Sequence, residues 1–282
     1  MTDKMKNLAV RTLSGIVLAA VVLGAVVWSP WSFGALLLLL LVGGMHEFYA
    51  LAEARGDRPQ RLIGMVTGAV LFAVNFAFLS GSAGAAGGLR PLLAAGMAFL
   101  LLLLPLMLVC ELYRRGENPA ANVGVTLLGI CYVALPLTLM AYIPFVGRYV
   151  WNPWTMLFFV FIIWANDVFA YLVGMAFGRH RLFERLSPKK SWEGFFGGVA
   201  GALVMGYVAS RCMGEAWWVW VGLALVAAVT GVLGDLVESM FKRAAGVKDS
   251  GTIIPGHGGI LDRFDAMLLA APFVVVYLWF VL

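Results

Sequence analysis

Residues 153–177 read PWTMLFFVFIIWANDVFAYLVGMAF, an apolar run with one Asn–Asp pair near its middle. A helix needs about 20 mostly apolar residues to cross roughly 30 Å of hydrocarbon. Further runs of this length occur on both sides of it, near residues 8–28, 31–52, 62–80, 91–112, 123–147, 192–213, 216–238 and 264–282. The sequence therefore predicts an all-α fold: a polytopic integral membrane helical bundle with about nine transmembrane helices.

The composition agrees with a membrane protein. Hydrophobic residues make up 62% of the 282 residues and charged residues only 12%, and the mean hydropathy is +0.92. About a quarter of the residues of a soluble domain are charged. No long hydrophilic block suggests an appended soluble domain, and the three cysteines form neither a CxxC pair nor a zinc motif.

The cations are distributed unequally between the two sides of the membrane when the loops are assigned alternately. Only Arg90, Arg148 and Arg211 fall on one side, and the rest of the 20 Lys and Arg residues fall on the other. Cytoplasmic loops carry the excess of Lys and Arg. We therefore expect a cytoplasmic N-terminus and an outside C-terminus, in a cytoplasmic (inner) membrane of the bacterial type.

Three polar features occur in or beside the apolar runs, one of them in the first half of the chain and two in the second. Asn166 and Asp167 lie at membrane depth, where an ionisable group is a candidate functional residue; a packing role satisfied by neighbouring helices is the alternative. Glu47, near the inner end of an early run, is compatible with a position at the interface. The loop GRHRLFERLSPKKSWEG (178–194) places cations and hydroxyls just before a helix start, as a phosphate site requires: Ser187, Lys189, Lys190 and Ser191.

The most polar stretch is SMFKRAAGVKDSGTIIPGHGGILDRFD, residues 239–265. Just before it, Asp235 and Glu238 share one helix face with Ser239. Asp262 and Asp265 follow on the first turns of the last run. Carboxylate oxygens together with substrate phosphates are the usual ligands of Mg²⁺. We therefore predict a Mg²⁺–phosphate site, in which a loop histidine such as His257 is a poorer metal ligand than the carboxylates.

This stretch, together with SPKKSWEG and ANDVFAYLVG, resembles the recurring blocks of CDP-diacylglycerol synthases, also called phosphatidate cytidylyltransferases. The resemblance covers roughly residues 160–282. It implies that CTP and phosphatidic acid give CDP-diacylglycerol and pyrophosphate at the cytoplasmic face. It further implies a homodimer within membrane lipids that needs Mg²⁺, with a monovalent cation such as K⁺ left open and no nucleic acid partner.

The resemblance assigns roles residue by residue. Asp235, Asp262 and Asp265 would bind the metal. The same three aspartates and Lys248 would be the catalytic residues. A larger set would bind substrates: Asp167, Ser187, Lys189, Lys190, Ser191, Glu193, Lys242, Arg243, Asp249, His257, Gly258, Gly259 and Arg263. We expect residues 1–150 to be a scaffold with lipid-facing and oligomer contacts, and residues 151–282 to be the catalytic region, with cytoplasmic loops 178–193 and 239–263.

Two other functions remain compatible with these charges. A transporter for an anionic solute would use intramembrane carboxylates as ion-coupling groups, although the first half of the chain holds almost no intramembrane charge. A CTP-dependent lipid kinase, or an archaeal-type lipid cytidylyltransferase, would use similar charges on another acceptor. Product analysis separates these functions.

Overall fold

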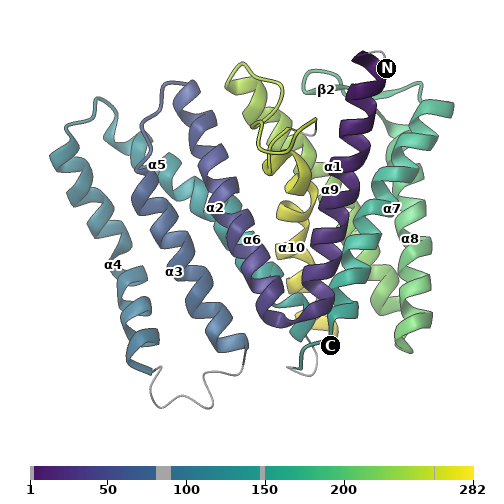
Figure 1. Ribbon diagram of the computed structural model, residues 1–282, viewed down its shortest axis with the longest axis horizontal. Helices are drawn as coiled ribbons and strands as arrows, with labels where there is room; N and C mark the ends of the chain where they lie inside the picture. Colours follow the sequence, from purple (N-terminus) through teal and green to yellow (C-terminus); the bar gives the residue numbers. More distant parts are fainter. Residues whose placement is uncertain (1–2, 81–89, 147–149, 257) are drawn as a thin grey trace. The chain divides into compact units, whose positions relative to one another are not determined.

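The computed structural model describes residues 3–80, 90–146, 150–256 and 258–282 and is almost entirely helical (Figure 1). Within these residues, nine helical segments are long and apolar enough to cross a membrane, which confirms the predicted polytopic bundle. The spans are α1 (Asp3–Trp28), α2 (Pro30–Ala54), α3 (Arg61–Leu79), α4 (Arg90–Arg114), the composite Pro119–Phe145, α7 (Pro153–Phe177), α8 (Trp192–Met213), α9 (Trp217–Ala244) and α10 (Leu261–Val281).

The fifth span is broken into shorter elements. It consists of α5 (Pro119–Gly129), a π-helical turn η1 (Ile130–Ala134), α6 (Leu135–Met140) and a 3₁₀ turn η2 (Ile143–Phe145). Pro136 lies in the first turn of α6, where a residue without an N–H is tolerated. The sequence predicted one continuous run here, because hydropathy does not report changes of helix type.

By its internal contacts the chain divides into two compact units. Unit 1 contains residues 1–141 and 244–263, and unit 2 contains residues 142–243 and 264–282. The polar segment after α9 therefore groups with the N-terminal helices, whereas we had placed it with the C-terminal region. The predicted functional division near residue 150 stays a prediction.

In unit 1, α2, α3 and α4 lie side by side in sequence order (Figure 1). Tyr49 of α2 packs against Gly64 and Gly129, and its hydroxyl donates to the Thr126 carbonyl at 2.9 Å. A buried carboxylate, Glu111 of α4, accepts from Gln60 Nε2 at 2.8 Å, and it also accepts from an amide on α5. These contacts join α2, α4 and α5. The buried polar side chains among them are hydrogen-bonded, as buried polar groups generally are.

In unit 2, α7 and α8 form the most extensive helix pair. Glycines on α8, at 194, 197, 198 and 201, let α7 approach closely. The connection between these helices is a hairpin of β1 (Arg181–Phe183) and β2 (Ser187–Ser191), paired antiparallel with Arg181 opposite Ser191. We had not predicted this hairpin, which is too short to produce a clear alternation pattern.

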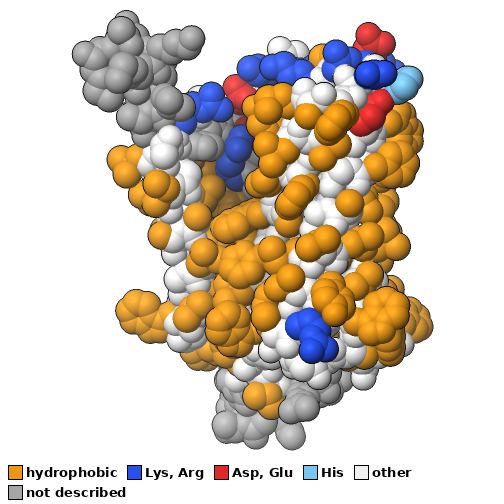
Figure 2. Space-filling model, turned by 90° about the vertical axis from the view of Figure 1, so that its right-hand side faces the viewer, with side chains coloured by type: hydrophobic (Ala, Val, Ile, Leu, Met, Phe, Trp, Pro, Cys, Tyr) orange, Lys and Arg blue, Asp and Glu red, His pale blue; other side chains and the backbone are white. Residues whose placement is uncertain are grey.

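The outer surface of unit 2 fits a lipid environment. Figure 2 faces α7 and α8 and shows hydrophobic side chains over the middle, with most of the Lys, Arg, Asp and Glu side chains gathered at one end. Large exposed side chains on these helices include Phe169, Tyr171, Phe196 and Tyr207. In water such a patch would be unfavourable, whereas in hydrocarbon it lowers the free energy. This unit is therefore built to span a membrane.

Candidate active site

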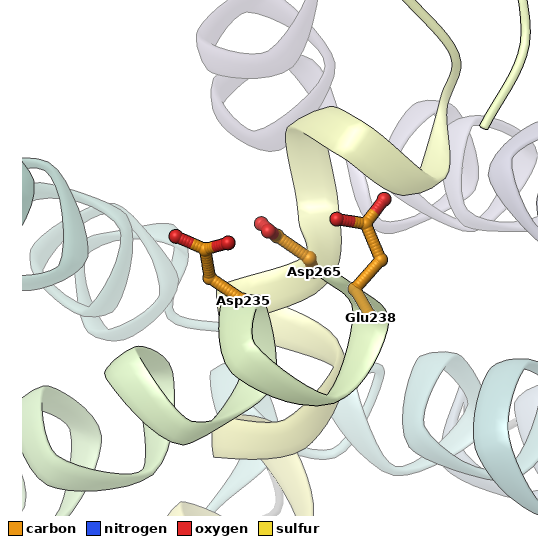
Figure 3. Close-up of side chains that lie close together, drawn as sticks. All are labelled: Asp235, Glu238 and Asp265. Carbon is orange, nitrogen blue, oxygen red and sulfur yellow. The ribbon is translucent and has the colours of Figure 1, made fainter. Parts of the chain in front are cut away.

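Three carboxylates of unit 2 gather where α9 and α10 meet. Asp235 and Glu238 lie one turn apart on α9, and Asp265 of α10 lies between them (Figure 3). Each offers one oxygen, and these oxygens all lie within 4.8 Å of one another. Glu238 is buried, and the two aspartates are partly accessible. We call these three residues the carboxylate cluster.

Two lysines neutralise part of the charge of the carboxylate cluster. Lys190 of β2 forms an ion pair with Asp235, and Lys242 forms one with Glu238 at 2.5 Å. Two ammonium groups leave three carboxylates with an excess of negative charge. Like charges this close repel strongly unless a cation or a proton joins them. Hard oxygen ligands with a residual negative charge suit a divalent ion such as Mg²⁺.

A cavity of about 480 Å³ opens beside the cluster in unit 2. This volume is typical of a pocket for a small molecule. Lys189 and Lys190 contribute its positive charge, and Asp235 belongs both to the cavity wall and to the carboxylate cluster. The full lining comes from α7, the hairpin, α8 and α9: Asn166, Asp167, Ala170, Tyr171, Gly174, Met175, Leu182, Ser187, Lys189, Lys190, Ser191, Gly194, Phe195, Val232 and Asp235.

The cavity brings together six of the predicted site residues, all from two separate blocks of sequence and the end of α9. These are Asp167, Ser187, Lys189, Lys190, Ser191 and Asp235. Asn166 lines the same cavity and is only 1% exposed, and its Oδ1 has no hydrogen-bond partner. A buried acceptor of this kind is costly unless a ligand or water satisfies it. A functional role for the Asn–Asp pair stays a prediction.

Hydrogen bonds to the first turn of α8 hold both ends of the hairpin beside the cavity. Ser191 is the N-cap of α8, and its hydroxyl accepts from Gly194 N at 3.1 Å, which agrees with the predicted helix start. The Glu193 carboxylate accepts from the backbone N–H groups of Arg179 and His180 and contacts His180 Nδ1 at 2.6 Å. Glu193 thus holds the hairpin in place and does not line the cavity.

The polar loop of unit 1, the segment between the end of α9 at Ala244 and the start of α10 at Leu261, is organised around Asp262. Its Oδ2 accepts three hydrogen bonds, from Ser250 N at 2.8 Å, Ser250 Oγ at 2.9 Å and Gly259 N at 2.8 Å. Gly258 has φ +83°, a left-handed conformation that favours glycine, and a Cβ there would meet Asp262 Oδ2 at 2.6 Å. In the described part of the chain, Asp262 is not a member of the carboxylate cluster.

A residue of the first half also holds this loop. Glu47 of α2 is 3% exposed. Its carboxylate accepts from Ser250 Oγ at 3.0 Å and from the backbone N–H groups of Ile260 and Leu261, both at 2.9 Å. Sequence reasoning left the role of Glu47 open, with a position at the interface as one possibility, because nothing in the pattern of an apolar run indicates a partner more than 200 residues away.

The remaining predicted residues lie in several places. Lys242 is buried in its ion pair, and Ser239 Oγ donates to Asp235 Oδ1 at 3.3 Å. Four charged candidates lie outside the cavity lining: Arg243, Lys248, Asp249 and Arg263. His257 lies outside the described residues. Glu238, which we had placed on the acidic face without a metal role, joins the cluster because its side chain shares the helix face of Asp235.

The sequence was compared with known proteins and protein families. A family model described as the cytidylyltransferase family matches residues 9–281. The chain belongs to this family. It is 32% identical to a phosphatidate cytidylyltransferase of Synechocystis sp. over 95% of each chain, and 33% identical to one of Haemophilus influenzae over 96% of this chain and 99% of the relative. A Staphylococcus aureus protein of the same name is 45% identical over 44% of this chain and 48% of its own length.

These relatives confirm the resemblance that the motifs indicated. The similarity is not confined to the second half, from which we inferred it, because nearly the whole chain aligns. Unit 1 of this cytidylyltransferase, with Glu47 on α2, is therefore part of the matched family region.

Proposed function

We propose that this protein transfers CMP from CTP to phosphatidic acid, giving CDP-diacylglycerol and pyrophosphate in phospholipid biosynthesis. The observation that carries the proposal is the match of nearly the whole chain to cytidylyltransferases whose relatives are named for the phosphatidate reaction. The cavity supports it, since lysines and carboxylates converge there within a membrane protein. The lysines can bind the phosphates of a nucleotide, and a lipid acceptor can reach the cavity from the membrane.

The reaction joins an oxygen of the lipid phosphate to the α-phosphorus of CTP and breaks the bond from that phosphorus to the oxygen bridging to the β-phosphate. The electron pair of the broken bond leaves with pyrophosphate. A phosphate monoester has a second pKa near 6, so the lipid phosphate is mostly ionised at neutral pH and attacks without a general base. What the protein must supply is alignment and neutralisation of negative charge.

The cavity residues are suited to these tasks. Lys189 and Lys190 bind the triphosphate, and the hydroxyls of Ser187 and Ser191 flank the same region. Asp167 and Asn166 line the α7 side, where a nucleoside has hydrogen-bonding partners. Because Lys190 also pairs with Asp235, it links the phosphate region to the carboxylate cluster. The lysines on one side, and a cation held by the carboxylate cluster on the other, would both attract the triphosphate and fix its position.

We assign the Mg²⁺ site to Asp235, Glu238 and Asp265. A bound Mg²⁺ would polarise a phosphoryl oxygen and offset the charge that develops on the leaving pyrophosphate. A metal role for Asp262 stays a prediction from the resemblance. So do substrate contacts of Lys242, Arg243, Lys248, Asp249, Gly258, Gly259 and Arg263, a homodimeric state, a monovalent ion such as K⁺, and an inner-membrane location with the site and N-terminus cytoplasmic.

Transfer of label from CTP tests the reaction. Protein purified in detergent is incubated with phosphatidic acid, Mg²⁺ and CTP labelled at either the α- or the γ-phosphate. We expect α-label, and no γ-label, to enter the lipid phase, and EDTA to abolish the transfer. Lipid-borne γ-label would instead identify a CTP-dependent lipid kinase.

Two further arms of the same assay test transfer to a different lipid and transport. Replacing phosphatidic acid by other lipid acceptors shows whether a different cytidylyltransferase reaction is faster. If no label reaches any lipid with folded protein, the proposed reaction is wrong, and uptake of an anionic solute into liposomes would then show whether the protein is a transporter.

A further inference from the structure

Glu47 of α2 hydrogen-bonds through its side chain to the segment of unit 1 that leads into α10. Its two backbone partners are Leu261, the first residue of α10, and Ile260, the residue before it. The free N–H groups of a first helical turn need acceptors, and an anion there also interacts favourably with the helix dipole. Glu47 therefore caps α10 from another helix.

The second acceptor at this helix start is Asp262 of α10 itself. It binds Gly259 N and Ser250, and Ser250 Oγ contacts both carboxylates. Ser250 is 7% exposed, so these contacts lie away from solvent. Glu47 and Asp262 together fix both ends of the segment from Ser250 to Leu261.

Close packing around Glu47 leaves its carboxylate little room to move. A Cβ at Gly251 would meet Glu47 Oε1 at 2.6 Å, and a Cβ at Gly259 would overlap both Ser250 Oγ and Glu47 Oε2. On α2, a Cβ at Gly43 would overlap the Ile260 side chain. The glycines of both segments thus permit an approach that any larger residue would prevent.

A purely structural account of Glu47 explains the packing but not the charge. Among the described residues it has no ion pair with a lysine or arginine. A buried carboxylate without a cation is costly and persists only where donors are fixed around it. Hydrogen bonds to a charged acceptor are about twice as strong as neutral ones. The charge therefore binds the helix start more rigidly than a neutral side chain of the same size would.

We propose that Glu47 is a positioning residue for the transfer reaction: its carboxylate fixes the Ser250–Leu261 segment and the first turn of α10, which carries Asp262. Asp265, a member of the carboxylate cluster, follows three residues later on the same helix. Through Ser250 and this first turn, Glu47 orders Asp262, which it does not touch. The proposal rests on the proposed function only for its kinetic consequence.

The test is Glu47→Gln in the full chain, with Glu53→Gln as the matched control. Gln has the same size as Glu but no charge. Its amide NH₂ replaces one of the two carboxylate oxygens that accept from the backbone N–H groups of Ile260 and Leu261, so one of these N–H groups loses its acceptor. Glu53 lies on the same helix, and its ion pair with Arg61 at 2.6 Å is partly exposed, so little depends on it. Hydrogen–deuterium exchange is measured without CTP or metal, over peptides that span residues 250–262.

We expect the amides of this segment to exchange about tenfold faster in Glu47→Gln, because their charged acceptor is lost. We also expect kcat for label transfer to fall roughly 10- to 100-fold and the Mg²⁺ concentration for half-maximal rate to rise by about tenfold, as for residues that orient metal ligands. KM for CTP should change by less than about threefold. Glu53→Gln should match the wild type in all four quantities.

Wild-type exchange together with wild-type kcat in Glu47→Gln would overturn the proposal. So would a loss of folded protein with unchanged kcat and Mg²⁺ dependence per folded molecule, because that pattern belongs to a purely structural residue. If the wild type transfers no label at all, the proposed reaction fails, and the exchange comparison alone then decides whether Glu47 orders the segment.

Ser250→Ala keeps the test decisive if Glu47→Gln gives no folded protein. This change deletes one donor to Glu47 and leaves the carboxylate in place. We expect the same direction of effect with a smaller size, about threefold to tenfold in kcat and in exchange. Wild-type values of both in Ser250→Ala would contradict the proposal.

Discussion

Replacing Asp235 by Asn is expected to lower kcat for CMP transfer by about 100- to 1,000-fold. Stabilisation of transition-state charge by a bound metal is worth several kcal/mol, and each 1.36 kcal/mol corresponds to tenfold in rate. Asp235 belongs to the carboxylate cluster, lines the cavity and pairs with Lys190. The change removes one charge from the metal ligands and releases the lysine from its partner. Label transfer at saturating CTP and Mg²⁺ measures the effect.

The control for Asp235→Asn is Asp57→Asn, the same chemical change in unit 1. Asp57 pairs with Arg55 at 2.6 Å in the connection between α2 and α3, where the arginine side chain is 47% and the aspartate side chain 17% exposed. Surface pairs of this kind contribute little to stability, so we expect full activity. A folded Asp235→Asn protein that keeps more than about a tenth of wild-type kcat would contradict a role in the metal site.

Replacing Asp262 by Asn is expected to leave a folded, membrane-inserted protein with at least about 100-fold lower activity. One oxygen of Asp262 accepts three hydrogen bonds from Ser250 and Gly259. Asn offers a single, uncharged oxygen, and an amide donor replaces the other. The change therefore loosens the segment before α10 and removes the charge that the family resemblance assigns to the metal. Size-exclusion chromatography checks folding, and label transfer measures activity.

Arg58→Gln is the comparison for Asp262→Asn, since Arg58 is an exposed cation in an early loop of the same unit. Its side chain is expected to serve only orientation in the membrane and attraction to anionic lipid. Full activity is therefore expected. If both variants were equally active, the assignment of a catalytic role to Asp262 would be wrong.

The spans could be predicted closely from the sequence. Apolar length and the absence of charge fix where a helix crosses a bilayer, and the predicted run 153–177 coincides with α7. Helix ends differ more from the ends of the apolar runs: α9 continues to Ala244, six residues beyond the end of its run at residue 238. An ion pair between Glu238 and Lys242, one turn apart, stabilises the last turns of this helix. A hydropathy criterion counts the same two charged residues against a membrane span.

The site could be predicted only in part. Local blocks identified Lys190, Asp235 and Asp265, because unusual charge beside apolar runs needs a reason. The sequence did not indicate that Lys190 pairs with Asp235 or that Glu238 completes the cluster, since these depend on how helices pack. Glu47 was beyond reach for the same reason: its partners lie in a different block, and its role is visible only in the hydrogen bonds to Ile260 and Leu261.

The most direct test of the metal assignment is whether the carboxylate cluster binds a divalent cation. Mn²⁺ is titrated into purified protein in place of Mg²⁺, and the free ion is followed by electron paramagnetic resonance. Wild type is compared with Asp265→Asn, a change of one charge at an oxygen that accepts from Ala266 N at 2.7 Å, and with Asp57→Asn. We predict Mn²⁺ binding to wild type and Asp57→Asn, and affinity at least about tenfold weaker in Asp265→Asn. Equal affinity in all three proteins would contradict the assignment of the metal site to Asp235, Glu238 and Asp265.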